Sequence, residues 1–508
     1  MDDGRIKNST RNMLAAIIYR IINLLFPFVI NTIIIKTLGV EYLGLNMIFA
    51  SILQILSITE LGFGSALVFS MYEPIAKGDT AKVSALLRLY RNVYMVIGGI
   101  VFAGGMLCLP LLPKIVNGEV PNGISIYILF VISLVNSVIG YFLFAYRSSV
   151  IIAHQRKDIT EKINILIEIA LNCSKVLILL VTKNYYLFCI LQPVYTIINC
   201  LLVAGASKRF FPQYKCEGTI SKKEKKSIFT RVIGLAIHKF CNVVSRSFDN
   251  VIISWFLGIY ILGKYNNYFV ITNAVGLFIY IITVSVSSSV GNSLVCETKE
   301  KNFRDFNIIQ LGFDMCLGWA SICLVCLTQP FVKIWIGEEL MFEDRTVIIF
   351  AVYLYAVVSS EVFMTYREAA GIWKHDRVRP FVEAGLNLLL NIVLVKIIGV
   401  DGVLISTIIT MGIIRVIWGS YYLFKELFTG YSHVKYLLKQ LLYLVITVII
   451  GVITYIICSY INIEGIPGLL VKGVVCSFIS IGLYLAVFFK TDEFKSLLNL
   501  AKGILKRK

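Results

Sequence analysis

The stretch KFCNVVSRSFDNVIISWFLGIYILGK, residues 239–264, combines a long apolar run with charged and amide side chains. At 3.6 residues per turn, its polar residues fall on one face of a helix, and the remaining faces are mostly Val, Ile and Phe. The polar face consists of Lys239, Asn242, Arg246, Asp249 and Asn250. A charge at the bilayer centre costs about 2.5 to 3.5 kcal/mol on insertion scales, so this face predicts a polar cavity or a partner of opposite charge inside a membrane.

The composition of the whole chain places this helix in a polytopic membrane protein. Of the 508 residues, 58% are hydrophobic and 15% are charged, whereas soluble domains have about 45 to 50% apolar and about 25% charged residues. Apolar runs long enough to cross a bilayer predict an all-α fold with about fourteen transmembrane helices. The predicted spans are 12–35, 43–70, 89–112, 124–146, 163–182, 185–206, 230–257, 265–290, 306–328, 346–366, 381–398, 400–424, 438–460 and 467–489.

The distribution of Lys and Arg orients this bundle. Most of the 48 basic residues fall in loops on the side that also holds both termini, which the positive-inside rule places in the cytoplasm. Only eight lie at the opposite ends of the predicted helices: Lys36, Lys114, Lys183, Lys264, Lys333, Arg345, Lys396 and Lys472. The net charge of +18 therefore needs no nucleic acid partner. We interpret residues 13–35 as the first membrane-spanning helix, which is kept in the mature protein, rather than as a cleaved signal peptide.

Cysteine and histidine predict neither a disulfide framework nor a metal site. Most of the 12 Cys residues lie in apolar runs, and no His has metal-ligand spacing to another His or Cys. Cys323 and Cys326 have the spacing of a redox motif, but within an apolar helix we interpret them as small packing residues.

The chain contains an internal repeat. Sliding the sequence by 219 residues places LGVEYLG, residues 38–44, over LGIYILG, residues 257–263. The same offset places Arg20 over Lys239, and it likewise aligns Asn23 with Asn242 and Asn31 with Asn250. The polar face of the opening stretch therefore occurs twice.

Further matches extend the repeat to a duplicated six-helix unit. Tyr146-Arg147 corresponds to Tyr366-Arg367, and Glu168 corresponds to Glu383. Because six is even, the two lobes form a parallel repeat about an axis along the membrane normal, a design that binds substrate near the midplane and works by alternating access. The expected division is an N-lobe at 1–206, a basic cytoplasmic linker at 207–229, a C-lobe at 230–424, two further helices at 425–490 and a cytoplasmic tail at 491–508.

The chain resembles the polysaccharide-transporter branch of the multidrug/oligosaccharidyl-lipid/polysaccharide exporter superfamily. The resemblance lies in the two Leu-Gly-x-x-x-Leu-Gly junctions, in Pro74-x-Ala76-x-x-Asp79, and in Asp249-Asn-Val-Ile-Ile followed by the second junction. It implies a bacterial cytoplasmic-membrane flippase for undecaprenyl-diphosphate-linked oligosaccharide. We expect a monomer without a cofactor.

A lipid diphosphate carries negative charge, which Arg and Lys bind well. We therefore predict a substrate site in which Arg20, Lys239 and Arg246 contact the diphosphate, with amides that bind phosphate or sugar: Asn23, Asn31, Asn242 and Asn250. A structural alternative pairs Arg246 with Asp249, at i and i+3, and Lys239 with Glu60 or Glu361 from a neighbouring helix.

Intramembrane carboxylates suggest coupling to H⁺ or Na⁺, with Asp249, Glu60 and Asp314 as the candidates. Structural pairing is the alternative for each of them.

Two other functions compete with the flippase. A cation-coupled multidrug antiporter of the same fold would need an acidic cavity, which Arg20 and Lys239 disfavour. A membrane glycan polymerase or glycosyltransferase would need a longer external loop than this chain has.

Overall fold

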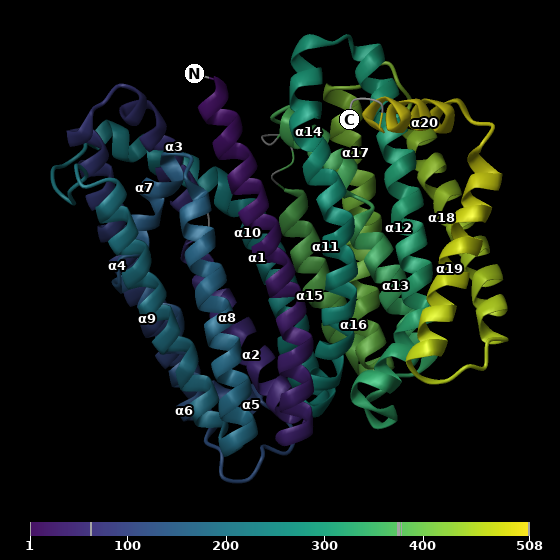
Figure 1. Cartoon of the computed structure of the whole chain (residues 1–508), viewed down its shortest axis with the longest axis horizontal. Coiled ribbons are helices and arrows are strands. Elements are labelled where there is room, and N and C mark those ends of the chain that lie inside the picture. Colours follow the sequence, from purple (N-terminus) through teal and green to yellow (C-terminus); the bar gives the residue numbers. More distant parts are fainter. Residues whose placement is uncertain (1, 61–62, 373–375, 377, 506–508) are drawn as a thin grey trace. The chain divides into compact units, whose positions relative to one another are not determined.

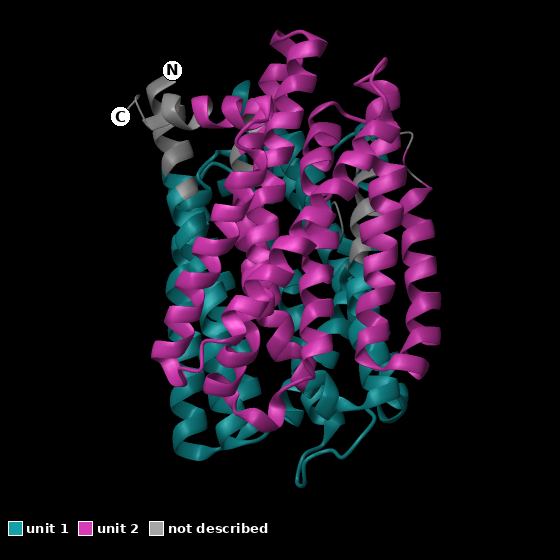
Figure 2. Ribbon diagram, turned by 90° about the vertical axis from the view of Figure 1, so that its right-hand side faces the viewer, with its two compact units in different colours: residues 1–263 teal, residues 264–508 magenta. Residues whose placement is uncertain are grey.

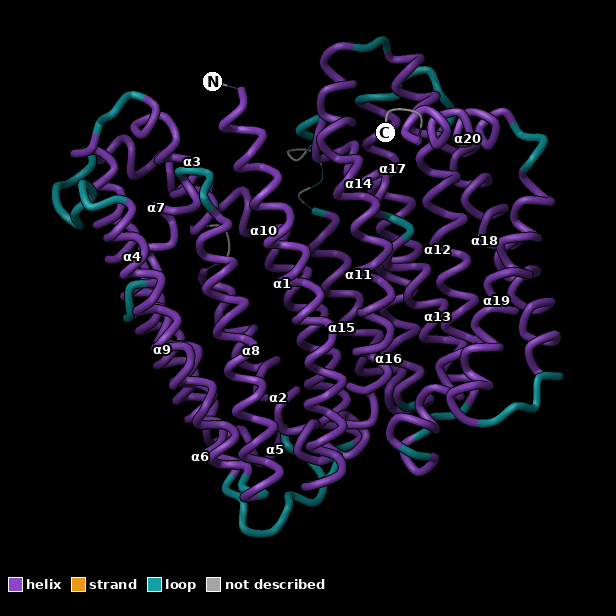
Figure 3. The backbone as a smooth tube through the Cα atoms, viewed as in Figure 1, coloured by secondary structure: helices purple, strands orange, loops and turns teal. Residues whose placement is uncertain are grey.

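The computed structural model describes residues 2–60, 63–372, 376 and 378–505. Within these, the side chains that are not described belong to residues 2–10, 13, 58, 59, 231, 233–239, 242, 244, 284, 285, 288 and 500–505. All secondary structure in the described residues is helical, without a strand (Figure 3). The all-α fold predicted from the sequence is confirmed.

The chain divides into two compact units, residues 1–263 and 264–508, which Figure 2 colours separately. Each unit is described here by itself. The boundary lies at the start of α11, so α10 packs within the first unit, although the repeat assigns it to the C-lobe. The repeat-based division into lobes stays a prediction.

The first unit is a bundle in which α1 packs along α8, α8 along α9, and α6 between α4 and α9 (Figure 1). α10 lies against α2 and α3. The helices of this unit are α1 (Asp2–Thr37), α2 (Glu41–Leu56), η1 (Ser57–Glu60), α3 (Phe63–Ala76), α4 (Thr80–Cys108), η2 (Leu109–Leu111), α5 (Leu112–Ile115), α6 (Ile126–Phe142), η3 (Ala145–Arg147), α7 (Ser148–Ala153), α8 (Lys157–Thr182), α9 (Tyr185–Phe210) and α10 (Lys222–Leu257).

Side-chain caps set where several of these helices begin. Asp79 accepts a hydrogen bond from the backbone N–H of Lys82 at the start of α4. Ser221 and Glu224 form a capping box at the start of α10, in which each side chain bonds the backbone of the other. Since the first N–H groups of a helix have no internal partner, these caps fix the helix ends beside the predicted cytoplasmic loops.

The two Leu-Gly-x-x-x-Leu-Gly junctions meet inside the first unit. A Cβ atom added to Gly44 would lie 2.1 Å from the carbonyl oxygen of Ile259, and one added to Gly263 would lie 2.2 Å from that of Val40. Gly44 is equivalent to Gly263 in the repeat, and Val40 is equivalent to Ile259. The contact is therefore reciprocal, as in a two-fold interface where residue i meets j and j meets i.

In the second unit, α12 packs against α13, α18, α19 and α20 (Figure 1). Its core holds a cluster of aromatic rings that includes Phe306, Tyr366 and Phe428. The elements are α11 (Ile259–Cys296), which begins in the first unit, then α12 (Lys299–Ile336), η4 (Glu338–Leu340), α13 (Asp344–Val358), α14 (Glu361–Ala369), α15 (Arg379–Ile398), α16 (Val400–Thr407), the π-helix η5 (Ile408–Ile414), α17 (Arg415–Glu426), α18 (His433–Ser459), α19 (Gly465–Phe488) and α20 (Asp492–Leu505).

The described residues contain 11 helices long and apolar enough to cross a membrane, or 12 if the bent pair α6 and η3–α7 forms one span. The predicted span 43–70 is divided into α2 and α3 around a stretch that lies partly outside the described residues. The predicted span 230–257 falls in α10, where many side chains are not described. A multi-pass membrane protein is confirmed, and the count of fourteen stays a prediction.

Candidate functional site

A cavity of about 620 Å³, lined by both polar and apolar side chains, lies within the first unit. Described residues of its wall come from the α-helices α1, α2, α6, α8 and α9 and from the short 3₁₀ helix η1. Its size is that of a pocket for a small organic ligand or for part of a larger one.

Amide side chains dominate the polar part of the cavity wall. The lining amides are Asn23, Asn31, Asn46, Gln54, Asn136, Asn172 and Gln192, and they are joined by Ser57, Ser133 and Ser137. Each amide offers two N–H donors and an acceptor oxygen without carrying a charge. Phe26 and Phe188 line the same cavity and add aromatic surface. The wall therefore suits a ligand with many hydroxyl groups.

Among the described residues, the lining of the cavity includes one cation and one carboxylate, Lys175 and Glu168, both on α8. Lys175 Nζ donates to Gln192 Oε1 at 2.5 Å and lies 5.0 Å from the centroid of the Phe188 ring. Asn172 Nδ2 donates to Glu168 Oε1 at 2.9 Å. Amide partners thus hold both charged groups at the wall, where their remaining hydrogen-bonding capacity is available to a ligand.

Pro27 lies inside the continuous helix α1, where this helix lines the cavity. Proline has no backbone N–H, so the carbonyl of Asn23, four residues earlier, lacks its usual donor within the helix. The Asn23 side chain instead donates to the carbonyl of Tyr19 at 2.9 Å.

The seven predicted substrate residues separate into four groups, of which Asn250 forms one by itself. Asn23 and Asn31 line the cavity. Arg20 and Arg246 are exposed and do not belong to the described cavity lining. The side chains of Lys239 and Asn242 lie outside the described residues.

The remaining predicted residue, Asn250, joins α10 to α2 beside the cavity. Asn250 Nδ2 donates to Ser51 Oγ at 2.8 Å. One turn earlier, Ser247 Oγ donates to Gln54 Oε1 at 3.2 Å, and Gln54 belongs to the cavity wall. The polar face of α10 is thus connected to the cavity through α2. The contribution of this face to substrate binding stays a prediction.

The carboxylates predicted for ion coupling have different surroundings. Glu60 accepts hydrogen bonds of 2.6 Å from the hydroxyls of Tyr94 and Tyr141, one on each oxygen. Asp249 is buried and has an interaction partner. Asp314 is buried in the second unit, where its Oδ2 accepts from Gln310 Nε2 at 2.9 Å and Gln440 Nε2 at 3.2 Å. The Oδ1 atom of Asp314 is buried without a hydrogen-bond partner among the described residues.

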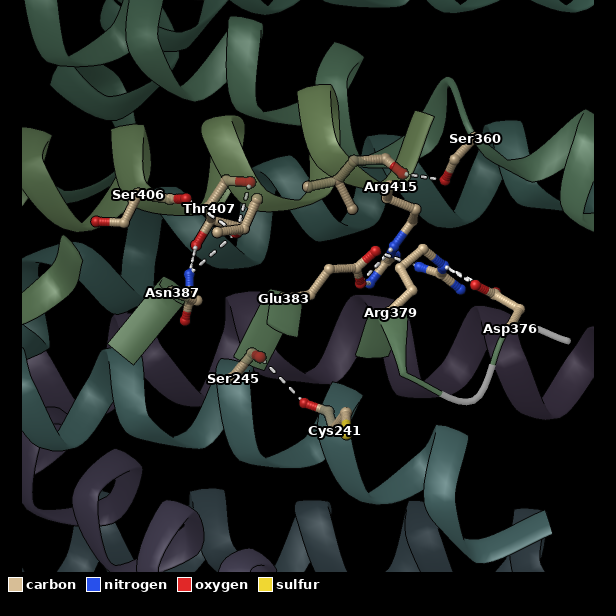
Figure 4. Close-up of polar contacts among 12 residues, drawn as sticks. Cys241, Ser245, Ser360, Asp376, Arg379, Glu383, Asn387, Ser406, Thr407 and Arg415 are labelled. Carbon is tan, nitrogen blue, oxygen red and sulfur yellow. Dashed lines mark hydrogen bonds and ion pairs between the residues drawn. The ribbon is translucent and has the colours of Figure 1, made fainter. Parts of the chain in front are cut away.

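The structure also contains a buried ionic network in the second unit that sequence analysis did not identify (Figure 4). Arg379 bridges Asp376, at 2.8 and 2.9 Å, and Glu383, which also accepts from Arg415 at 3.1 Å. Arg367 adds an ion pair of 2.6 Å to Asp376. The repeat had already singled out Arg367 and Glu383, because it matches them to Arg147 and Glu168. Sequence spacing does not show that side chains from α14, α15 and α17 form ion pairs with one another.

Comparisons with known proteins identify the family and the fold. A family model described as polysaccharide biosynthesis protein matches residues 9–287. The fold is similar to that of the lipid II flippase MurJ in an inward closed conformation, with 17% sequence identity, a TM-score of 0.63, and coverage of 94% of this chain and 98% of that chain. No curated protein matches the chain.

Two further solved structures share the fold. One is an inward-facing multidrug resistance MATE family transporter of the MOP superfamily, with 12% identity, a TM-score of 0.61, and coverage of 80% of this chain and 94% of that chain. The other is a MOP superfamily transporter from Pyrococcus furiosus that is described as having a binding pocket of reverse polarity, with 12% identity, a TM-score of 0.54, and coverage of 83% of this chain and 96% of that chain. These structures are of transporters and a flippase, and none is of an enzyme.

Proposed function

Because the chain belongs to the polysaccharide biosynthesis protein family, we propose that it flips an undecaprenyl-diphosphate-linked oligosaccharide from the cytoplasmic to the outer leaflet of a bacterial cytoplasmic membrane. The observation that carries the proposal is the amide-lined cavity of about 620 Å³ in the first unit. Both termini lie in the cytoplasm in this proposal, and the protein acts as a monomer by alternating access.

The cavity supports a carbohydrate ligand by its chemistry. Asn and Gln side chains match sugar hydroxyls because each amide both donates and accepts hydrogen bonds. An apolar sugar face packs on an aromatic ring, and Phe26 and Phe188 supply such rings in the wall. A site built to hydrogen-bond hydroxyl groups rejects ligands that lack them, since its buried polar groups are then left unpaired.

The diphosphate requires cations. Lys175 is the cation of the cavity wall, and Arg20, Lys239 and Arg246 are the further candidates from α1 and α10. We assign the diphosphate to these four residues and the sugar to the amides. The proposed route places the lipid tail outside the cavity, in the bilayer.

Asp314 is the strongest of the three candidates for coupling to H⁺ or Na⁺. Its Oδ1 is buried without a hydrogen-bond partner among the described residues, and so is Oε1 of Gln310, one turn earlier on α12. Buried oxygen atoms without donors are costly unless a proton or a cation satisfies them. A proton on Asp314, or a Na⁺ ion beside it, removes that cost.

A cation-coupled multidrug antiporter is the second candidate function, because MATE transporters share the fold. Such a protein needs an acidic cavity for cationic drugs, whereas here Glu168 is balanced by Lys175. The charge balance of the wall therefore favours the glycan flippase.

Complementation tests the proposal. The wild-type gene, in a strain deficient in its own glycan flippase and supplied with the matching glycan genes, restores surface polysaccharide. Replacing Arg20 and Lys239 together by Ala abolishes restoration while membrane levels stay normal. Full restoration by the double variant would remove these two residues from the diphosphate site, and drug export by the wild type without restoration would favour the antiporter.

A further inference from the structure

Four cysteines from three helices gather in the second unit. The sulfur atoms of Cys326 on α12, Cys458 on α18 and Cys476 on α19 all lie within 4.8 Å of one another. Cys323, one turn before Cys326, places its sulfur 3.7 Å from that of Cys476. The three clustered cysteines are 6%, 3% and 0% exposed, in that order.

We infer that Cys326, Cys458 and Cys476 form a binding site for a soft metal ion of the Zn²⁺ or Cu⁺ class. Thiolate ligands select soft ions such as Zn²⁺ and Cu⁺, whereas sites made of carboxylate, carbonyl and water ligands suit Mg²⁺, Ca²⁺ and Mn²⁺. Sulfurs at about 2.3 Å from a tetrahedral Zn²⁺ lie about 3.8 Å from one another. Sulfur atoms already within 4.8 Å of one another reach that geometry through small side-chain rotations.

A small pocket gives an ion a path to this cluster. The pocket has a volume of about 230 Å³ and is lined by Cys326 and Cys458 together with Gln329, Asp344 and Lys472. Asp344 is exposed at the start of α13. A metal site in the interior of a protein needs such an entry path, so the pocket is an observation independent of the sulfur geometry.

The charge of the site fits its surroundings. Three thiolates and one Zn²⁺ carry a net charge of −1, which is costly in an apolar environment unless a cation compensates it. Lys472 lines the pocket beside two of the ligands and carries the opposite charge. Binding releases the thiol protons through the pocket to the solvent.

Such an ion would join three helices. α18 and α19 lie beyond the sequence repeat, and both pack on α12. A metal bound to one cysteine from each helix therefore fastens this helical pair to the second unit. The inference concerns stability and metal binding and does not depend on the transported substrate.

Metal analysis of the purified full-length protein tests the inference. The protein is purified in detergent under reducing, oxygen-free conditions, loaded with Zn²⁺ and freed of excess metal by gel filtration. The expected result is one Zn²⁺ per chain by mass spectrometry. Cys476→Ala and Cys458→Ala lose this metal, whereas the matched control Cys316→Ala, also on α12 but outside the cluster, keeps it.

A second measurement uses the unaltered protein, so it does not depend on the folding of a variant. Co²⁺ added to the reduced protein gives the near-ultraviolet absorption of thiolate-to-cobalt charge transfer, and Zn²⁺ abolishes this absorption. Absence of both Zn²⁺ retention and cobalt absorption overturns the inference. Equal Zn²⁺ retention by Cys476→Ala and Cys316→Ala overturns it too, because the metal then binds elsewhere. Metal uptake that persists after the cysteines are blocked, or reoxidation of the reduced thiols to a disulfide without Zn²⁺ binding, likewise contradicts a thiolate site.

Discussion

Gly44 lies against the backbone of Ile259, where an added Cβ atom would be only 2.1 Å from the carbonyl oxygen. The equivalent residue of the second junction, Gly263, lies in the same way against Val40. The repeat that is visible in the sequence is thus also a pair of reciprocal backbone contacts within the first unit. Only glycine permits so close an approach of two backbones.

Alanine at either junction glycine should destabilise the protein. Overpacking of a tight contact costs about 1 to 3 kcal/mol, so Gly44→Ala and Gly263→Ala are expected to lower the melting temperature in detergent. The control is Gly99→Ala in α4, where an added Cβ meets nothing within 4 Å. Because glycine inside a helix is less stable than alanine, this control is expected to be neutral or stabilising. Equal melting temperatures for all three variants would contradict the close contact.

Removing an amide from the cavity wall should weaken transport. Asn172→Ala and Gln192→Ala each lose about 1 kcal/mol of hydrogen bonding, which corresponds to a roughly fivefold loss of apparent affinity for the glycan. The measurement is the substrate concentration that gives half-maximal transport. Asn164→Ala is the matched control, since Asn164 is also on α8 but is hydrogen-bonded to Asn199 at 3.3 Å and not part of the described lining. Similar values for all three variants would place the glycan outside this cavity.

Asn in place of Asp314 should separate binding from coupling. Asp314→Asn preserves the shape of the side chain but holds no exchangeable carboxyl proton and attracts a cation less. Transport driven by an imposed H⁺ or Na⁺ gradient is expected to fall to the rate without a gradient, while glycan binding stays unchanged. The matched variant Glu60→Gln, whose carboxylate is already bonded to Tyr94 and Tyr141, retains gradient dependence. The reverse pattern would assign coupling to Glu60.

Glu383→Gln should destabilise the second unit. Glu383 pairs with Arg379 and Arg415, and Arg379 is almost fully buried. Breaking a buried ion pair by removing one partner costs about 3 to 5 kcal/mol, so a lower yield and melting temperature are expected. Glu73→Gln provides the control, because its pair with Lys77 lies in solvent and exposed pairs contribute little. An unchanged melting temperature in Glu383→Gln would show that the network is not structural.

Features could be predicted from the sequence where the residues that form them are close along the chain or are related by the repeat. The all-α fold, the two Leu-Gly-x-x-x-Leu-Gly junctions and the polar face of α1 with Asn23 and Asn31 follow from periodicity and self-similarity. Each depends on spacing that can be counted along the sequence.

Features built from several helices were not predicted in this way. The cavity combines Asn136, Lys175 and Gln192 from three helices, and apolar periodicity does not specify which helices are neighbours. For the same reason Cys323 and Cys326 were interpreted as packing residues, because Cys458 and Cys476 are distant in the sequence. Lys175 and Glu168 also line the cavity, and neither was among the predicted substrate residues.

Reconstituted flipping measures the central claim most directly. Purified protein is placed in liposomes that contain a fluorescent undecaprenyl-diphosphate-linked oligosaccharide, and an enzyme outside the vesicles reports how much of the glycan reaches the outer leaflet. We predict rapid accessibility with the wild-type protein, and much slower accessibility at the same glycan concentration with the Asn172→Ala, Gln192→Ala double variant. Wild-type liposomes that behave like protein-free ones, or a double variant as active as the wild type, would contradict the claim that this cavity carries the glycan across the membrane.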